Sequence, residues 1–485
     1  MTTNKAADPG PPQPFDRRWL ALAVIAVAQL MTALDATIVN IALPSAQHSL
    51  RFDDSARQWV ITAYTLCFAG LLLLGGRIAD VVGRRRTFMI GLTGFAGASL
   101  LAGVATTLPV FIAGRAIQGA AAALVSPSAL SLLAVTFTDR GQRAKAFAVF
   151  GAVASSGAAA GLLLGGVLTN YAGWRWCLFI NVVLAALVLA VARTALPDTA
   201  RVGGAGIDVA SAALATGGLA VVVFGSSRAA QHGWSSPLVI GTLIGGLATL
   251  ALFGVRQHRI RVPLLPLRIL ANRNRAGAYL AAAAAVIGSF GMFLLLTYYL
   301  QLVLHYSPIR TGLAVLPLTV TNAVSGYQLG NRLVPRVPPS ILLGGGLMIA
   351  ASGLALLGRL TEHSHYVTSV LPAQLLLGTG MGALFPPSFA LAVRGVTDRD
   401  AGVAAAVINT ATQVGSSIGT AVLNTVAVTT TAAYLVTHRS STTHVGALVH
   451  GYATAARWSA ATLAAAAVIV AVVINAPSPN RQTTP

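Results

Sequence analysis

Residues 19–43 read WLALAVIAVAQLMTALDATIVNIAL, and Asp35 is the only charged side chain among them. As an α-helix this run extends roughly 37 Å, which is enough to cross a hydrocarbon core about 30 Å thick. Similar apolar runs recur along all 485 residues, of which 55% are hydrophobic and only 9% are charged. A soluble globular chain carries about 25% charged residues. We therefore predict an all-α polytopic membrane protein.

The apolar runs predict fourteen transmembrane helices, because each run is long enough to span a bilayer. Their expected positions are residues 19–43, 58–76, 87–106, 109–135, 146–168, 174–193, 208–226, 237–254, 276–303, 311–331, 340–359, 366–393, 402–428 and 454–474. The segment 429–453 is rich in Thr, Ser and His and is predicted to be a loop.

The distribution of positive charge predicts the orientation of these helices. An even number of spans places both termini on one side. Loops on that side hold 23 Lys and Arg, the opposite loops hold 8, and Arg115 alone lies inside a helix. Because cytoplasmic loops carry the excess of Lys and Arg, both termini are expected to be cytoplasmic.

The most basic loop, 255–275, indicates how the helices are grouped, because it precedes a final block of six. The expected order is six helices, two, and six, as in transporters built from two bundles. The predicted divisions are a cytoplasmic tail (1–18), a first six-helix bundle (19–193), a linker with two inserted helices (194–275), a second six-helix bundle (276–474) and a cytoplasmic tail (475–485).

Several classes of function are not expected. The net charge is +20, but the positive residues lie in short loops with no polar domain to form a nucleic-acid site, so no nucleic-acid partner is expected. The chain has no phosphate-binding GxxxxGK[ST] loop, which argues against ATP as the energy source. It shows no recognisable nucleophile triad or metal-ligand spacing. We expect neither an enzyme nor a metal site.

Two charged residues fall within predicted spans at similar depth. Asp35 is roughly 24 Å along its helix, or roughly 6 Å from the outer edge, and Arg115 is roughly 9 Å from that edge. An ionised group there is costly unless it faces a partner or a cavity. We therefore expect Asp35 and Arg115 to share a water-filled cavity and to couple electrostatically. The alternatives are an acid close enough to the surface to stay wet and an Arg that only holds helices together.

Glycines mark two further stretches. In GGRIADVVGRRR, residues 75–86, Gly76 and Gly83 permit a tight turn, and Asp80 can pair with nearby Arg residues such as Arg84 and Arg85. In GAVASSGAAAGLLLGGVL, residues 151–168, small residues recur every four positions and let helices approach closely. These are Gly157, Gly161 and Gly165, followed by Gly166. Two readings remain for this helix: simple tight packing, or a pliable helix between bundles.

Together these stretches resemble the major facilitator superfamily, in particular its fourteen-helix drug:proton antiporter branch. GRIADVVGRRR (76–86) is similar to the signature of the loop between helices two and three. LDATIVNIALP (34–44) is similar to the first-helix signature, RAIQG (115–119) to that of helix four, and the glycine-rich helix to the antiporter motif. WRW and FIN (174–176, 179–181) and YLQ and YSP (299–301, 306–308) also look like this branch. The similarity runs from about Trp19 to Ile474.

The resemblance implies alternating access by two six-helix bundles. It implies that Asp80 and its Arg neighbours form a cytoplasmic gate, and that Asp35 and Arg115 take part in proton coupling, with protons as the coupling ion and no other cofactor. Two positions depart from the usual pattern. Val81 replaces a basic residue in the gate loop, and Leu162 replaces a Pro that often follows Gly161, so that helix is expected to bend less.

The substrate is expected to be lipophilic and neutral or monocationic, because the predicted helices nine to fourteen contain no Asp or Glu. Aromatic and amide side chains suit a mostly apolar pocket, although each is equally plausible as a helix-packing residue. The candidates are Tyr64, Phe68, Gln118, Phe290, Tyr298, Tyr299, Gln301, Asn322, Phe385, Asn409 and Gln413.

The sequence thus predicts a proton-coupled exporter of drugs or antibiotics in a cell membrane. The Ala, Gly and Arg richness suggests a bacterial source. Two alternatives remain: an exporter of a lipid or an endogenous secondary metabolite, and a membrane sensor that does not transport. The expected partners are a small lipophilic substrate and membrane lipid, and the protein is expected to act as a monomer.

Overall fold

The computed structural model describes residues 17–53, 56–137, 139–197, 208–260, 263–265, 267–333, 336–394, 396, 398–437 and 444–475, and these contain helices and no β-strand. The helices of the first part are α1 (Arg17–Leu50), α2 (Arg57–Val82), α3 (Arg84–Gly103), α4 (Leu108–Thr136), α5 (Arg140–Tyr171) and α6 (Trp176–Ala195). Then come α7 (Val209–His232), α8 (Pro237–Arg259) and the short α9 (Leu267–Ala271). The last part contains α10 (Arg273–Tyr298), η1 (Tyr299–Val303), α11 (Pro308–Leu333), α12 (Pro339–Leu357), η2 (Tyr366–Val370), α13 (Leu371–Val393), α14 (Asp398–Thr437) and α15 (His444–Val473).

Every segment predicted to be a transmembrane helix is helical, with boundaries that shift by several residues. Within the described residues, ten helices are long and apolar enough to cross a membrane. They are α1, α4, α6, α7, α8, α10 with η1, α12, η2 with α13, α14 and α15. The prediction of an all-helical membrane protein is confirmed, whereas the number of fourteen spans stays a prediction.

The predicted loop at 429–453 is wrong over most of its length, because α14 continues to Thr437 and α15 begins at His444. Threonines do not end α14, because their hydroxyls donate back to carbonyls of the preceding turn. Thr431 donates to the Ala427 carbonyl over 2.7 Å and Thr437 to the Ala433 carbonyl over 3.1 Å.

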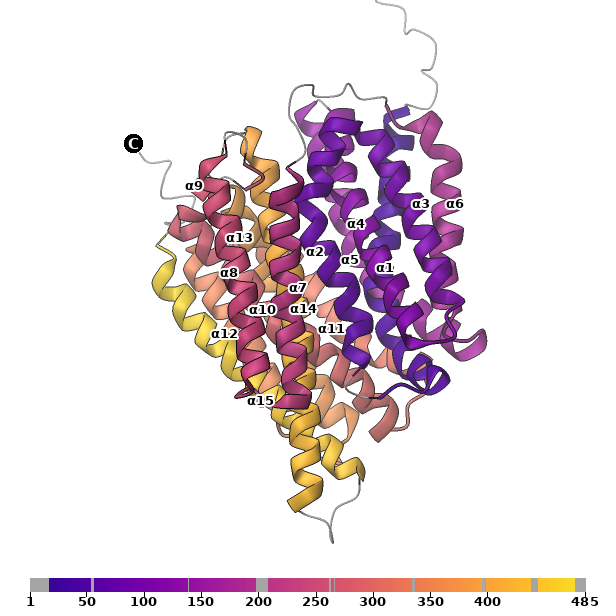
Figure 1. The fold of residues 1–485 in the computed structure, drawn as a ribbon, viewed down its shortest axis with the longest axis vertical. Helices are drawn as coiled ribbons and strands as arrows, with labels where there is room; N and C mark the ends of the chain where they lie inside the picture. The colour runs from indigo at the N-terminus through magenta and orange to yellow at the C-terminus, as the bar shows by residue number, and fades with distance from the viewer. Residues whose placement is uncertain are drawn as a thin grey trace, which may run out of the picture.

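The helices form two groups, seen in Figure 1 as indigo to magenta α1–α6 and salmon to yellow α10–α15. We call these the first bundle and the second bundle. Helices α7 and α8 pack on each other, and α7 also contacts α2 of the first bundle and α14 of the second. The Thr216 hydroxyl of α7 donates to the Gly70 carbonyl of α2 over 2.9 Å. The inserted pair thus covers one seam between the bundles.

Side-chain contacts define the two ends of the molecule. The end where α1 begins also holds the end of α4, since the Trp19 ring packs on Phe137 at 5.5 Å. In the second bundle, Arg273 at the start of α10 donates to the Val473 carbonyl at the end of α15 over 2.8 Å. The start of α1 lies at the top of Figure 1 and the end of α15 at its upper left. We call this the terminal end, and the opposite end, where α1 finishes and α2 begins, the loop end.

The two bundles are joined at the loop end. The hydroxyl of Tyr298, the last residue of α10, donates to the Gln47 side chain of α1. The Gln301 amide of η1 donates to the Ile41 carbonyl of α1 over 3.2 Å. A Cβ on Gly166 of α5 would lie only 2.7 Å from the Ile309 Cα of α11, so these helices touch along their backbones. One hydrophobic core runs through both bundles in this region and includes Leu34, Leu162 and Leu295.

Candidate functional site

The candidate site is an ion pair in the middle of the first bundle. The Arg115 guanidinium on α4 donates from Nη1 to Oδ2 of Asp35 on α1 over 2.7 Å. Asp35 is 0% exposed and Arg115 is 2% exposed. The prediction that these two residues meet is confirmed. The helices α1 and α4 run in opposite directions, so residues at equal depth in the two helices lie side by side.

Two amides complete the surroundings of the carboxylate. Asn181 of α6 donates to Oδ1 of Asp35 over 2.7 Å, and Gln118 of α4 donates to the same oxygen over 2.9 Å. The Gln118 carbonyl oxygen accepts from Arg115 Nη1 over 2.6 Å. Each oxygen of Asp35 therefore accepts from at least one donor, which is what a buried carboxylate requires.

The guanidinium is held from its other side by α2. Nε of Arg115 donates to the Val60 carbonyl over 3.2 Å, and its Cζ lies 4.5 Å from the centre of the Tyr64 ring. A cation over an aromatic face is stabilised by the ring quadrupole, the more so when water is excluded. Gln118 also lies 2.7 Å from the Ser99 hydroxyl of α3. Five of the six helices in the first bundle thus contribute to one network.

The site is sealed in this conformation. Gln118, Asn181 and Ser99 are each 0% exposed and Tyr64 is 3% exposed. The expectation of a water-filled cavity shared by Asp35 and Arg115 is therefore wrong here, since protein donors take the place of water. A buried ion pair whose two carboxylate oxygens both accept hydrogen bonds resists the gain or loss of a proton until one partner moves.

The glycines of α5 lie against α1 on the side next to this site. A Cβ on Gly161 would lie 2.1 Å from the Thr37 hydroxyl and 2.7 Å from the Leu34 carbonyl. Gly157 and Gly165 meet Ala33 and Ile38 of α1 in the same way. The stripe therefore joins α5 to α1 within the first bundle, while Gly166 alone of these glycines faces the second bundle.

The predicted cytoplasmic gate lies at the terminal end, between α2 and α3. Gly83 has φ of +106°, a backbone conformation that favours glycine, and it forms the turn by itself. Gly76 lies inside α2, where a Cβ would lie 3.7 Å from the Pro127 Cβ of α4. Arg85 donates to the Leu196 carbonyl over 3.4 Å and Arg84 is the first residue of α3. The side chain of Asp80 is outside the described part, so its pairing stays a prediction.

The predicted substrate residues fall in three places. Tyr64 and Gln118 belong to the ion-pair network, with the Phe68 ring 5.9 Å from that of Tyr64. Tyr298, Tyr299 and Gln301 lie at the loop end, where the Tyr299 hydroxyl donates to the Thr361 carbonyl over 3.0 Å. The others lie within the second bundle and are half-buried, namely Phe290, Asn322, Phe385, Asn409 and Gln413. Their role as substrate ligands stays a prediction.

A second polar cluster, which the sequence did not indicate, joins the bundles at the loop end. Arg57 of α2 is 1% exposed and donates to the Asn424 side chain of α14 over 2.7 Å. Asn424 donates in turn to Gln58 over 3.0 Å, and the Arg57 Cζ lies 4.3 Å from the Tyr298 ring centre. We call Arg57, Gln58, Asn424 and Tyr298 the loop-end latch. No motif marks it, because Arg57 reads as an ordinary loop cation.

The ion-pair network also contains residues that the sequence analysis did not choose. Asn181 stands in the FIN stretch used for the family resemblance, and its place seven residues inside the predicted span 174–193 was the signal that could have identified it. Ser99 gave no signal, since a single serine in an apolar helix usually bonds to its own helix.

Comparison with known proteins agrees with this fold. The family model of the Major Facilitator Superfamily matches residues 25–420. The puromycin resistance protein pur8 of Streptomyces alboniger is 47% identical over 95% of this chain and 92% of its own length. The cephamycin export protein CmcT of Amycolatopsis lactamdurans is 36% identical over 84% of each chain, and the multidrug efflux pump LfrA of Mycolicibacterium smegmatis is 30% identical over 88% and 84%.

Solved structures support the fold alone. A bacterial homologue of the lysosomal transporter Spinster superposes with a TM-score of 0.66 at 16% identity, covering 96% of this chain and 97% of that one. The POT family transporter PepTSo superposes with a TM-score of 0.67 at 15% identity, covering 95% of this chain and 98% of that one. The protein described here is a multi-pass transporter of the bacterial plasma membrane, not an enzyme, and it belongs to the major facilitator superfamily.

Proposed function

We propose that the protein is a proton-coupled exporter of lipophilic, neutral or monocationic antibiotics that works by alternating access. In this proposal the chain crosses the membrane fourteen times as six, two and six helices, and both termini are cytoplasmic. It acts as a monomer with protons as the coupling ion and needs no other cofactor. Cytoplasmic drug leaves the cell while protons enter through Asp35.

The export direction is supported by relatives. Proteins 47%, 36% and 36% identical to this chain are named for puromycin resistance, cephamycin export and lincomycin resistance. Resistance and export share one physical requirement, which is outward movement of the compound. The sequence of the second bundle adds that its acids, Glu362, Asp398 and Asp400, stand before or after the predicted spans. Without a buried carboxylate there, a dication would lack a partner, so neutral or monocationic drugs fit best.

Proton coupling rests on one observation, the sealed contact between Asp35 and Arg115. Among the described residues, Asp35 is the acid whose ion pair is fully buried. The groups that donate hydrogen bonds to its carboxylate come from α4 and α6. When the helices move apart, the carboxylate loses the guanidinium that stabilises its charge and binds a proton instead. Proton affinity then depends on conformation, as coupling requires.

The loop-end latch supports the conformational part of the proposal. Arg57, Asn424 and Tyr298 join the bundles at the end we assign to the outside. Release of substrate to the outside requires these contacts to break. Because Asp35 lies on α1, whose far end carries Gln47 in contact with Tyr298, a shift of α1 relative to α4 changes the latch and the ion pair together.

A narrower substrate class is a second candidate. The cephamycin export protein and a protein named as a probable actinorhodin transporter, 34% identical over 86% of this chain, are named for secondary metabolites. We therefore also propose an endogenous secondary metabolite as the cargo. The buried ion pair argues against a sensor that does not transport, because charge buried in a membrane protein is costly to keep without a use.

Transport into liposomes tests the proposal. Purified protein in vesicles with an acidic lumen should accumulate labelled puromycin against its gradient, and nigericin, which dissipates the pH gradient, should abolish the accumulation. Other antibiotics, dyes and labelled lipids form the panel. Movement of a lipid without a pH gradient, together with no movement of any drug, would contradict the proposal and favour lipid export.

A further inference from the structure

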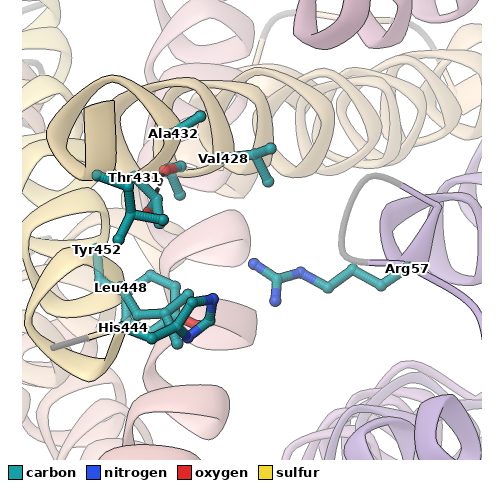
Figure 2. A pocket seen from close by; sticks show the side chains of 9 residues that line it. Arg57, Val428, Thr431, Ala432, His444, Leu448 and Tyr452 are labelled. Atoms are coloured by element: carbon teal, nitrogen blue, oxygen red, sulfur yellow. Dashed lines mark hydrogen bonds between the residues drawn. The ribbon is translucent and has the colours of Figure 1, made fainter. Parts of the chain in front are cut away.

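A small cavity lies next to the loop-end latch, between α2, α14 and α15 (Figure 2). Its volume is about 170 Å³. Arg57 enters it from the first bundle, and the remaining lining residues come from the second bundle. In Figure 2 the Arg57 side chain points from α2 toward the side of the cavity that carries His444 and Tyr452. The cavity is separate from the ion-pair network, which lies in the middle of the first bundle.

The lining has a positive side and an apolar side. The guanidinium of Arg57 forms the first, with the His444 ring close by in Figure 2. Val428, Leu435 and Leu448 contribute aliphatic surface to the second. None of the described residues that line the cavity is Asp or Glu. A guanidinium in a mostly apolar and partly enclosed space favours a carboxylate, which it can bind through two parallel hydrogen bonds.

The size limits the ligand. Pockets for drug-sized molecules usually measure about 300–1,000 Å³, so the exported antibiotic does not fit here. An apolar cavity of about 150 Å³ in another protein accommodates benzene. We propose that this cavity binds a small monocarboxylate with a compact apolar body, the size of benzoate, with its carboxylate on Arg57 and its ring between α14 and α15.

Occupancy of this site depends on the conformation of the protein. Arg57 belongs to the first bundle and the apolar wall to the second, so the complete site exists only while the bundles meet at the loop end. The carboxylate therefore stabilises the conformation closed at that end. At ten times its Kd, benzoate disfavours the open conformation about elevenfold. If the protein exports drugs as proposed, such acids slow export without competing for the drug site.

Binding of benzoate to the purified protein tests the site without any transport, so its failure is distinct from failure of the proposed function. Isothermal titration calorimetry should detect binding of benzoate. It should show no binding of benzyl alcohol, which has the same ring and no charge. Arg57→Gln should weaken benzoate binding at least tenfold. Because that change also affects the latch, Val428→Phe and Leu448→Phe, which fill the cavity and keep Arg57 and Asn424, should weaken it equally.

Thr429→Phe is the matched control, because Thr429 is exposed, does not line the cavity and donates only to carbonyls of its own helix. It should bind benzoate as the unmodified protein does. Three results would overturn the proposal. The first is that the unmodified protein binds no benzoate up to the solubility limit of benzoate, and the second is that it binds benzyl alcohol equally well. The third is an unchanged affinity for benzoate in both cavity-filling variants.

Discussion

The Asp35 carboxylate lies 2.7 Å from the Arg115 guanidinium, and neither side chain reaches solvent. Donors from α4 and α6 surround the pair, and the Tyr64 ring covers the guanidinium at 4.5 Å. Such a pair is stable only while both charges are present, because each one compensates for the desolvation of the other. The pair therefore links the charge of Asp35 to the packing of the whole first bundle.

Removing one charge should cost more stability than removing both. Arg115→Gln leaves the Asp35 carboxylate buried without its cation, and loss of one partner from a buried pair costs about 3–5 kcal/mol. The double variant Asp35→Asn/Arg115→Gln keeps hydrogen-bonding groups and has no charge to compensate. Thermal unfolding in detergent should rank the unmodified protein first, then the double variant, then Arg115→Gln. A double variant less stable than Arg115→Gln would contradict a compensated pair.

The contact between α5 and α1 should tolerate no side chain at Gly161. An alanine Cβ there would lie 2.7 Å from the Leu34 carbonyl, so α1 must move away and carry Asp35 with it. Gly161→Ala should lower the unfolding temperature and slow transport. Gly97→Ala on α3 is the control, because its Cβ meets open space and alanine favours a helix by about 1 kcal/mol over glycine. Equal behaviour of the two variants would show that close packing is not required.

The loop-end latch should hold the bundles together. Asn424→Ala removes the acceptor of the buried Arg57 and the donor to Gln58, so the closed conformation loses stability relative to the open one. Spin labels at the exposed positions Val104 and Val436, with Cys67 and Cys177 replaced by alanine, report the separation at that end. Double electron–electron resonance should show a longer distance population in Asn424→Ala.

The control for the latch is Thr429→Ala, since Thr429 lies on the same helix and bonds only within it. Its distance distribution should match that of the unmodified protein. If Asn424→Ala also leaves the distribution unchanged, the latch does not set the conformational equilibrium.

Asp208, which caps the N-terminus of α7, should give a pH-dependent contribution to stability. Desolvation raises the pKa of Asp208, but hydrogen bonds from Ser211 and Arg256 together outweigh it and hold that pKa below its ordinary value. A lowered pKa in the folded state stabilises the protein above the unfolded pKa of about 3.9, and the gain disappears as pH falls through the folded value. Asp208→Asn should therefore lower the unfolding temperature at pH 7, and the difference from the unmodified protein should vanish once the pH is below the folded pKa of Asp208. A difference that persists there would contradict the assignment.

The sequence predicted the positions of the helices and the meeting of Asp35 with Arg115, because hydropathy and the depth of a residue along a helix both follow from position in the sequence alone. It predicted tight packing of the glycine-rich helix as one of two readings, but glycine spacing indicates a flat face without showing that the neighbour is α1. The loop-end latch was missed, because pairing between Arg57 and Asn424 joins residues 367 positions apart and depends on how the bundles rotate.

Two errors have physical causes. The loop expected at 429–453 was inferred from its many Thr, Ser and His residues, but the threonine hydroxyls satisfy carbonyls within α14. The cavity expected around Asp35 was inferred from the cost of burying a charge, yet Asn181 and Gln118 supply the donors that water would have given. Which side chains converge on one point is a property of helix packing that periodicity does not encode.

The central claim is that Asp35 carries the coupled proton. The direct test measures protons released to weakly buffered solution when puromycin, or another transported drug from the panel, is added to purified protein in detergent. The unmodified protein should release protons on binding, and Asp35→Asn should bind the drug with no release. Asp139→Asn is the control, because Asp139 caps α5 in an exposed position and asparagine caps equally well. Unchanged proton release from Asp35→Asn would contradict the account.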